Sequence, residues 1–131
     1  MTESAARTVY EQLGGEPGVR RLVDRFYDEM DARPEVKPLR AQHPGDLAES
    51  RDKLFWFLSG WLGGPPLYVQ KKGHPRLRAR HLPFVVDESM RDQWMLCMRA
   101  ALADVGGVLP HDTREKLDAA LFQLADHMIN R

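Results

Sequence analysis

The sequence has one cysteine, no excess of charge of either sign and no long apolar run. The single thiol, Cys97, excludes an intramolecular disulfide framework. The 19 basic residues balance the 19 acidic residues, which removes the net positive charge that favours nonspecific nucleic-acid binding. No apolar stretch is long enough to cross a bilayer, and the N-terminal segment lacks the basic-then-apolar order of a signal peptide. We therefore expect a cytoplasmic protein that binds neither nucleic acid nor a membrane.

Length and composition predict one packed domain over residues 1–131. Hydrophobic residues make up 43% of the chain and charged residues 29%, which is ordinary for a globular protein. No segment has the period-two pattern of a β-strand, and the chain has no repeat, low-complexity tract or linker. The predicted fold class is all-α.

Apolar spacing predicts four long helices, which cover residues 17–32, residues 47–62, residues 88–105 and residues 110–129. Asp87 is the expected N-cap of the third helix, and Gly106 and Gly107 end it. A short helix is expected over residues 4–13. The segment after Pro34 is expected to hold at most a single helical turn, and residues 65–73 are expected to form a loop. A two-turn helix with the sequence PRLRARH is expected to begin at Pro75 and to end at His81.

Most familiar catalytic and metal-binding patterns are missing. The five histidines have no HExxH or CxxC spacing around them, so a structural zinc site is not predicted. No serine or cysteine lies in a nucleophile motif, and Cys97 falls on the apolar face of its predicted helix, where it reads as a small buried hydrophobe.

The basic run KKGHPRLRAR at residues 71–80 has three interpretations. It is a weak candidate for a nucleic-acid patch, because the whole chain is neutral. It could also be a solvated loop. The third interpretation fits better, because cations beside an apolar, aromatic-rich pocket suit an anionic cofactor with carboxylate side chains. A lone histidine as the only strong protein ligand fits haem, since the porphyrin supplies four equatorial nitrogens.

Five segments then carry a resemblance to a known family. They are YEQLGG near the start, RFYDEM at 25–30, WLGGP at 61–65, GHPRLRARHLPF at 73–84 and RDQWMLCM at 91–98. The sequence resembles the group II truncated haemoglobins, which fold two helices over two around haem. The resemblance implies haem b (iron protoporphyrin IX) as the cofactor and a truncated globin fold.

The resemblance also implies roles for individual residues. His81 matches the proximal iron ligand, Tyr27 the distal tyrosine and Trp94 the tryptophan that distinguishes group II. His43 matches a distal position that is aromatic in many relatives, if a one-residue gap is placed near Pro44. Alternatively, His43 only caps the preceding turn and points to solvent. The implied haem contacts, among which Lys53 and Arg80 pair with the propionates, are Phe26, Ser50, Lys53, Leu54, Leu58, Tyr68, Arg80, His81, Phe84, Trp94 and Met98.

These assignments predict a haem protein that binds dioxygen and releases it slowly. Dioxygen on haem iron carries partial negative charge, so the hydroxyl, indole and imidazole donors of Tyr27, Trp94 and His43 would each stabilise it by roughly 1–2 kcal/mol net. The expected role is oxygen-linked redox protection, detoxification or sensing rather than bulk oxygen transport. Carbon monoxide, nitric oxide, peroxide and an unidentified reductase are further expected partners, and the chain is expected to be a monomer or a homodimer.

Two other functions stay open at this point. The first is a haem enzyme with peroxidase-like or nitric oxide dioxygenase activity, which needs the same residues. The second is a haem-free helical module that interacts through KKGHPRLRAR.

Overall fold

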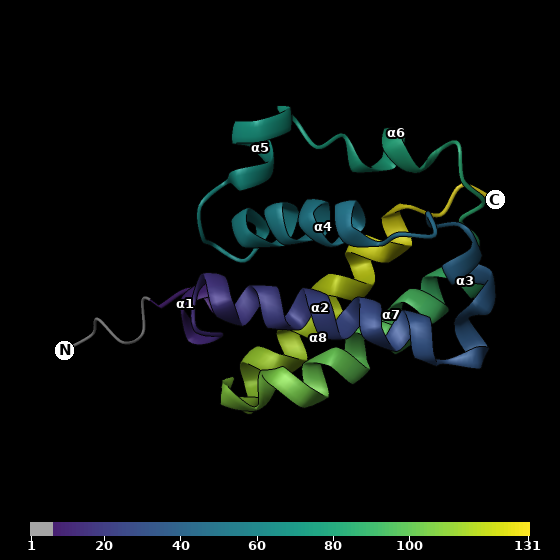
Figure 1. The fold of residues 1–131 in the computed structure, drawn as a ribbon. Helices are drawn as coiled ribbons and strands as arrows, with labels where there is room; N and C mark the ends of the chain where they lie inside the picture. The colour runs from purple at the N-terminus through teal and green to yellow at the C-terminus, as the bar shows by residue number, and fades with distance from the viewer. Residues whose placement is uncertain (1–6) are drawn as a thin grey trace.

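Four long helices form the framework of the part that the computed structural model describes, residues 7–131, in which every regular element is helical. They are α2 (Glu16–Ala32), α4 (Ala48–Trp61), α7 (Glu88–Val105) and α8 (His111–His127). Helix α2 is central, because it packs against both α4 and α7, and α7 packs against α8 (Figure 1). The result is two helices over two. No helix in residues 7–131 is both long and apolar enough to span a bilayer.

The apolar stripe of α2 explains its central place. Val19, Leu22, Val23, Phe26 and Met30 are at most 1% exposed. They lie three or four residues apart, so they share one face of the helix. Burying each of these side chains contributes roughly 1.5–3 kcal/mol, so this face orders the core around α2.

Ion pairs hold α4 against α2. The Arg51 guanidinium on α4 lies 3.1 Å from Asp24 Oδ1 and 2.9 Å from Asp28 Oδ1, both on α2. Arg20 on α2 reaches Asp52 on α4 at 3.1 Å. Such partly exposed pairs add little stability, but they fix how the two helices align.

Short helices join the framework. They are α1 (Val9–Gln12), the 3₁₀ turn η2 (Pro34–Val36), α3 (Lys37–Ala41), α5 (Leu67–Lys72), α6 (Leu77–His81) and the 3₁₀ turn η3 (Gly106–Val108). Figure 1 shows α5 and α6 on the same side of α4, away from α2.

Two predictions about these connections were wrong for the same reason. Residues 65–73, expected to be a loop, contain α5, and residues 34–41 contain η2 followed by α3 rather than a single turn at most. Proline interrupts a helix interior but is accepted in the first turn, where its missing N–H needs no partner. Pro34 and Pro38 lie in such first turns, and Pro66 lies at the N-cap of α5.

Two other helices are shorter than expected, and one cap is confirmed. Helix α1 begins at Val9 because Thr8 and Glu11 form a capping box; residues 4–6 of the predicted range lie outside the described residues. Helix α6 begins two residues later than expected, because Arg76 adopts a left-handed conformation with φ 46°. The Asp87 cap is confirmed, since its carboxylate accepts from the Met90 N–H at 2.9 Å.

Candidate functional site

His81 lies at the end of α6 with one ring nitrogen engaged. Its Nδ1 lies 2.6 Å from the Leu77 carbonyl oxygen, which can only accept a hydrogen bond. Nδ1 must therefore carry the proton, and in the neutral ring Nε2 keeps a free lone pair. In this tautomer a histidine can bind a metal through Nε2.

The segment that follows His81 is apolar and open. No residue of α6 is buried, and the side chains of Leu82, Phe84 and Val85 are 51%, 45% and 45% exposed. Large apolar side chains on an open segment beside a ligand-ready imidazole suit contact with an apolar cofactor.

Two amide side chains hold this segment in place. Asn130 Nδ2 donates to the carbonyls of His81 (3.1 Å) and Phe84 (3.0 Å), and its Oδ1 accepts from the Val86 N–H (3.1 Å). Gln42 donates to the Val85 carbonyl (2.7 Å) and accepts from the Val85 N–H (3.0 Å). We call Gln42 and Asn130 the amide clamp. Sequence analysis missed both residues, since an isolated Asn or Gln belongs to no motif.

Tyr27, Trp94 and His43 come together from three different parts of the chain. The Phe26 ring is the common neighbour, with its centroid 4.9 Å from that of Tyr27 and 5.2 Å from that of Trp94. The His43 ring, just after α3, lies 5.9 Å from the Tyr27 ring in an edge-on arrangement. Helices α2 and α7 and the end of α3 thus bring a hydroxyl, an indole and an imidazole to one place.

The Tyr27 hydroxyl has no hydrogen-bond partner among residues 7–131, although the residue is only 6% exposed. Among residues 7–131, every side-chain nitrogen or oxygen that is fully shielded from solvent has a hydrogen-bond partner. Because the Tyr27 hydroxyl has none, it is not fully shielded and must reach open space. Burial raises the pKa of Tyr27 far above its ordinary value, which the charge of Arg51 only partly opposes. The phenol therefore stays protonated and is able to donate.

His43 differs from the expectation in its hydrogen bonding. Its Nδ1 lies 3.0 Å from the Leu39 carbonyl, so Nδ1 is the protonated nitrogen and Nε2 of the neutral ring is only an acceptor. Burial lowers the pKa of His43, the bond to Leu39 opposes this, and the charges of Arg40 and His81 lower the pKa further. In this tautomer Nε2 donates only after the ring is protonated, so the prediction that His43 donates to a ligand applies to the protonated ring.

The alternative interpretation of His43, that it caps the preceding turn and points to solvent, agrees with the structure in its first part only. The ring does cap a turn through the Leu39 carbonyl, but it is half-buried and faces Tyr27 instead of pointing to solvent.

The other predicted contacts differ in burial. Phe26, Leu58, Tyr68 and Met98 are buried, and Ser50 and Leu54 are half-buried on α4. The Arg80 guanidinium lies 5.8 Å from the centre of the Tyr68 ring, and its Nε donates to the Pro75 carbonyl at 2.7 Å. Lys53 is exposed and lies 3.5 Å from Glu49.

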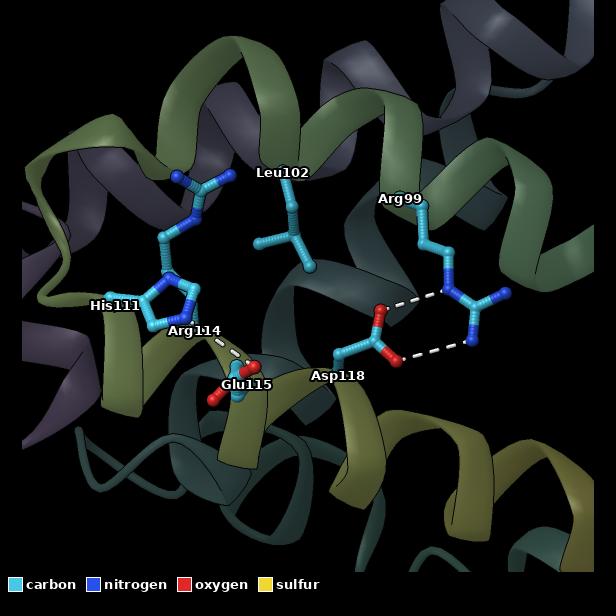
Figure 2. Close-up of a pocket in the computed structure, with 6 residues that line it drawn as sticks. All are labelled: Arg99, Leu102, His111, Arg114, Glu115 and Asp118. Carbon is cyan, nitrogen blue, oxygen red and sulfur yellow. Dashed lines mark hydrogen bonds and ion pairs between the residues drawn. The ribbon is translucent and has the colours of Figure 1, made fainter.

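A separate pocket of about 550 Å³ lies between α7 and α8 and includes none of the predicted site residues. Figure 2 shows two pairs among its charged and titratable side chains: Arg99 makes two hydrogen bonds to Asp118 (2.8 and 3.1 Å), and His111 lies 3.4 Å from Glu115, whereas Arg114 has no ion-pair partner among residues 7–131. Four of its five charged or titratable side chains therefore pair with one another, which leaves Arg114 as the single unpaired one in the described part of the chain.

Comparisons with known proteins agree with the resemblance. Residues 8–130 match the family model of the bacterial-like globins. The chain is 43% identical over 122 residues to Group 2 truncated hemoglobin YjbI of Bacillus subtilis, covering 93% of this chain and 88% of that protein. It is similar to the solved cold-adapted truncated hemoglobin of Pseudoalteromonas haloplanktis TAC125, with TM-score 0.91, 50% identity and coverage of 95% and 99% of the two chains.

A second solved structure has the same fold. It is the truncated oxygen-avid haemoglobin from Bacillus subtilis, with TM-score 0.82, 43% identity and coverage of 95% of this chain and 100% of that one. The expected truncated globin fold is confirmed.

Proposed function

The chain belongs to the bacterial-like globin family, whose haemoglobins bind haem b and diatomic gases such as dioxygen. We therefore propose that His81 ligates the haem iron and that Tyr27 and Trp94 donate hydrogen bonds to the gas. The observation that carries the proposal is the bond from His81 Nδ1 to the Leu77 carbonyl at 2.6 Å. It leaves Nε2 as a neutral nitrogen ligand and fixes the direction of the ring.

When bound, haem supplies an iron atom with one coordination position for a diatomic ligand and carries propionates that need cationic partners. Arg80 and Lys53 are exposed cations that fit this need, as the resemblance implies. The buried side chains of Leu58, Met98 and Phe26 give the apolar surroundings that exclude water from the ligand.

The distal residues favour slow release of dioxygen. The Tyr27 hydroxyl and the Trp94 indole are neutral donors, and each net hydrogen bond stabilises a partly negative ligand by about 1.4 kcal/mol, or roughly tenfold in the release rate. Two donors together would slow release by roughly 100-fold. The Bacillus subtilis relative described as oxygen-avid supports this proposal.

Slow release suits oxygen-linked redox protection, detoxification or sensing in the cytoplasm more than oxygen transport. Carbon monoxide and nitric oxide fit the same position as dioxygen. A peroxidase-like activity is less well supported, because His43 would have to be protonated to act as a general acid, and its pKa is lowered. The single domain over residues 1–131, the reductase and the choice between monomer and homodimer stay predictions.

The test is reconstitution with haem followed by ligand release. We expect a Soret band that shifts on reduction and again on addition of carbon monoxide, and dioxygen dissociation that is about 100-fold faster in the Tyr27→Phe, Trp94→Phe double variant. A protein that gives no Soret shift, or a double variant within threefold of the wild type, would contradict the proposal.

A further inference from the structure

The neutral net charge of the chain conceals a separation of charge along the sequence. Residues 53–86, which we call the basic segment, contain six of the 19 lysines and arginines and none of the 19 acidic residues. The rest of the chain therefore has 13 basic and 19 acidic residues. A separation of this size produces a field with a positive side and a negative side, even when the total is zero.

The structure places the basic segment on one side of the molecule. It includes most of α4 and all of α5 and α6, and α5 and α6 lie on the side of α4 away from α2 (Figure 1). All six cations are exposed; they are Lys53, Lys71, Lys72, Arg76, Arg78 and Arg80.

These cations are also largely unneutralised. Seven arginines outside the segment have ion-pair partners: Arg20, Arg25, Arg33, Arg40, Arg51, Arg91 and Arg99. Within the basic segment, Lys53 alone has a carboxylate within 4.0 Å among residues 7–131, namely Glu49 at 3.5 Å. Seven of the 13 cations outside the segment are thus used in ion pairs within the protein. In the segment, Lys71, Lys72, Arg76 and Arg78 have no carboxylate within 4.0 Å among residues 7–131 and are not assigned to the propionates, so they are available to attract an external anionic surface.

Apolar side chains accompany the cations. Of the six large hydrophobic side chains exposed in the described part of the chain, five lie in the basic segment: Trp61, Val69, Leu82, Phe84 and Val85. Because Leu82, Phe84 and Val85 suit contact with the cofactor, Trp61 and Val69 are the two left for a partner. The ring centroids of Trp61 and Phe57 lie 6.5 Å apart in a stacked arrangement. Apolar side chains surrounded by charge are the usual composition of a protein–protein interface.

We propose that the basic segment docks an acidic one-electron carrier protein that reduces the haem iron, an inference that rests on the proposed function. In this step the carrier's reduced iron–sulfur cluster loses one electron and ferric haem iron gains it. No bond forms or breaks, and no proton moves. The location fits the step, because His81, the proposed iron ligand, belongs to the same segment, so a carrier docked there approaches the haem.

The test uses haem-loaded protein and a plant-type [2Fe–2S] ferredoxin, which is acidic, as the probe. We compare Lys72→Glu with Lys116→Glu, which makes the same charge change at an exposed position of α8. Binding of oxidised ferredoxin to the ferric protein is measured by calorimetry, and reduction by reduced ferredoxin is measured by stopped flow. Both are done at about 0.01 M salt, where the Debye length is ~30 Å, and at about 1 M, where it is ~3 Å.

At low salt we expect Lys72→Glu to weaken binding and slow reduction by about tenfold, and Lys116→Glu to change each by less than about twofold. The difference should vanish at high salt. Arg78→Glu serves as a second variant and should act like Lys72→Glu. Reduction by dithionite should be the same in all of the proteins, because that small reductant needs no docking surface.

Equal losses in Lys72→Glu and Lys116→Glu, or no loss in any variant, would overturn the proposal. It is also overturned if the variants keep ferredoxin binding but lose binding to vesicles of phosphatidylglycerol and phosphatidylcholine, or to duplex DNA. Failure of the proposed function is seen separately, because the Soret band and carbon monoxide binding are recorded before the ferredoxin is added.

Discussion

Replacing Tyr27 by phenylalanine isolates the contribution of one hydroxyl group to ligand release. The ring of Tyr27 packs edge-on against Phe26 at 4.9 Å, and a phenylalanine keeps that packing. Because the hydroxyl has no partner among residues 7–131, its removal leaves no protein group unsatisfied. In the apo protein we therefore expect the free energy of unfolding to stay the same or to rise slightly.

The effect on the liganded protein should be large by comparison. Loss of one net hydrogen bond to dioxygen costs about 1.4 kcal/mol, which predicts roughly tenfold faster dissociation if the effect falls on the off-rate. The assay is stopped-flow displacement of dioxygen by carbon monoxide. Tyr10→Phe is the matched control, because it removes a tyrosine hydroxyl from α1, and it should leave the rate unchanged.

A dissociation rate within twofold of the wild type would refute the donor role of Tyr27, unless Trp94 takes its place. Tyr27→Phe is therefore also measured in the Trp94→Phe background. A rate unchanged in that background as well leaves no donor role for the tyrosine.

Three further predictions follow from the surroundings of the site. Dioxygen release should slow as the pH falls below about 6.5 in the wild type but not in His43→Phe. The apo wild type should lose stability over the same range, because burial lowers the pKa of His43 in the folded protein and the unfolded imidazole therefore binds a proton more readily. Identical pH profiles for the two proteins would contradict this. Asn130→Ala should lower the stability of the apo protein by about 1–3 kcal/mol and speed haem transfer to apomyoglobin, because the carbonyls of His81 and Phe84 lose their donor. A wild-type stability together with a wild-type transfer rate would rule out the amide clamp. Burial raises the pKa of Cys97 to about 11, so a disulfide reagent at pH 8 should modify this thiol only when the protein unfolds. Rapid modification of the native protein would contradict the burial of Cys97.

Much of the fold was predictable because it depends on local patterns. The stripe of α2 is regular over five apolar residues, and its burial satisfies the spacing rule directly. The Asp87 cap is likewise a local signal. The errors at residues 34–41 and 65–73 arose where proline was taken as a helix breaker, although its effect depends on whether it falls in the first turn or in the interior.

The candidate site was only partly predictable, because its chemistry depends on contacts between distant segments. Sequence motifs singled out His81, Tyr27 and Trp94. The protonated nitrogen of His43 follows from a backbone carbonyl that only the fold brings within 3.0 Å. Asn130 reaches His81 across 49 residues, and no spacing rule anticipates such a bond. The charge separation of residues 53–86 was present in the sequence, but a whole-chain sum cancels it.

The central claim is that His81 holds the haem iron, and it is tested most directly by the absorption spectrum of His81→Gly. We expect this variant to lose haem during purification or to give an altered ferrous spectrum, and added imidazole to restore a wild-type-like spectrum by taking the place of the missing ring. His43→Gly, which removes the imidazole beside Tyr27, should keep haem. If His81→Gly retains haem with an unchanged ferrous spectrum and no response to imidazole, His81 is not the iron ligand.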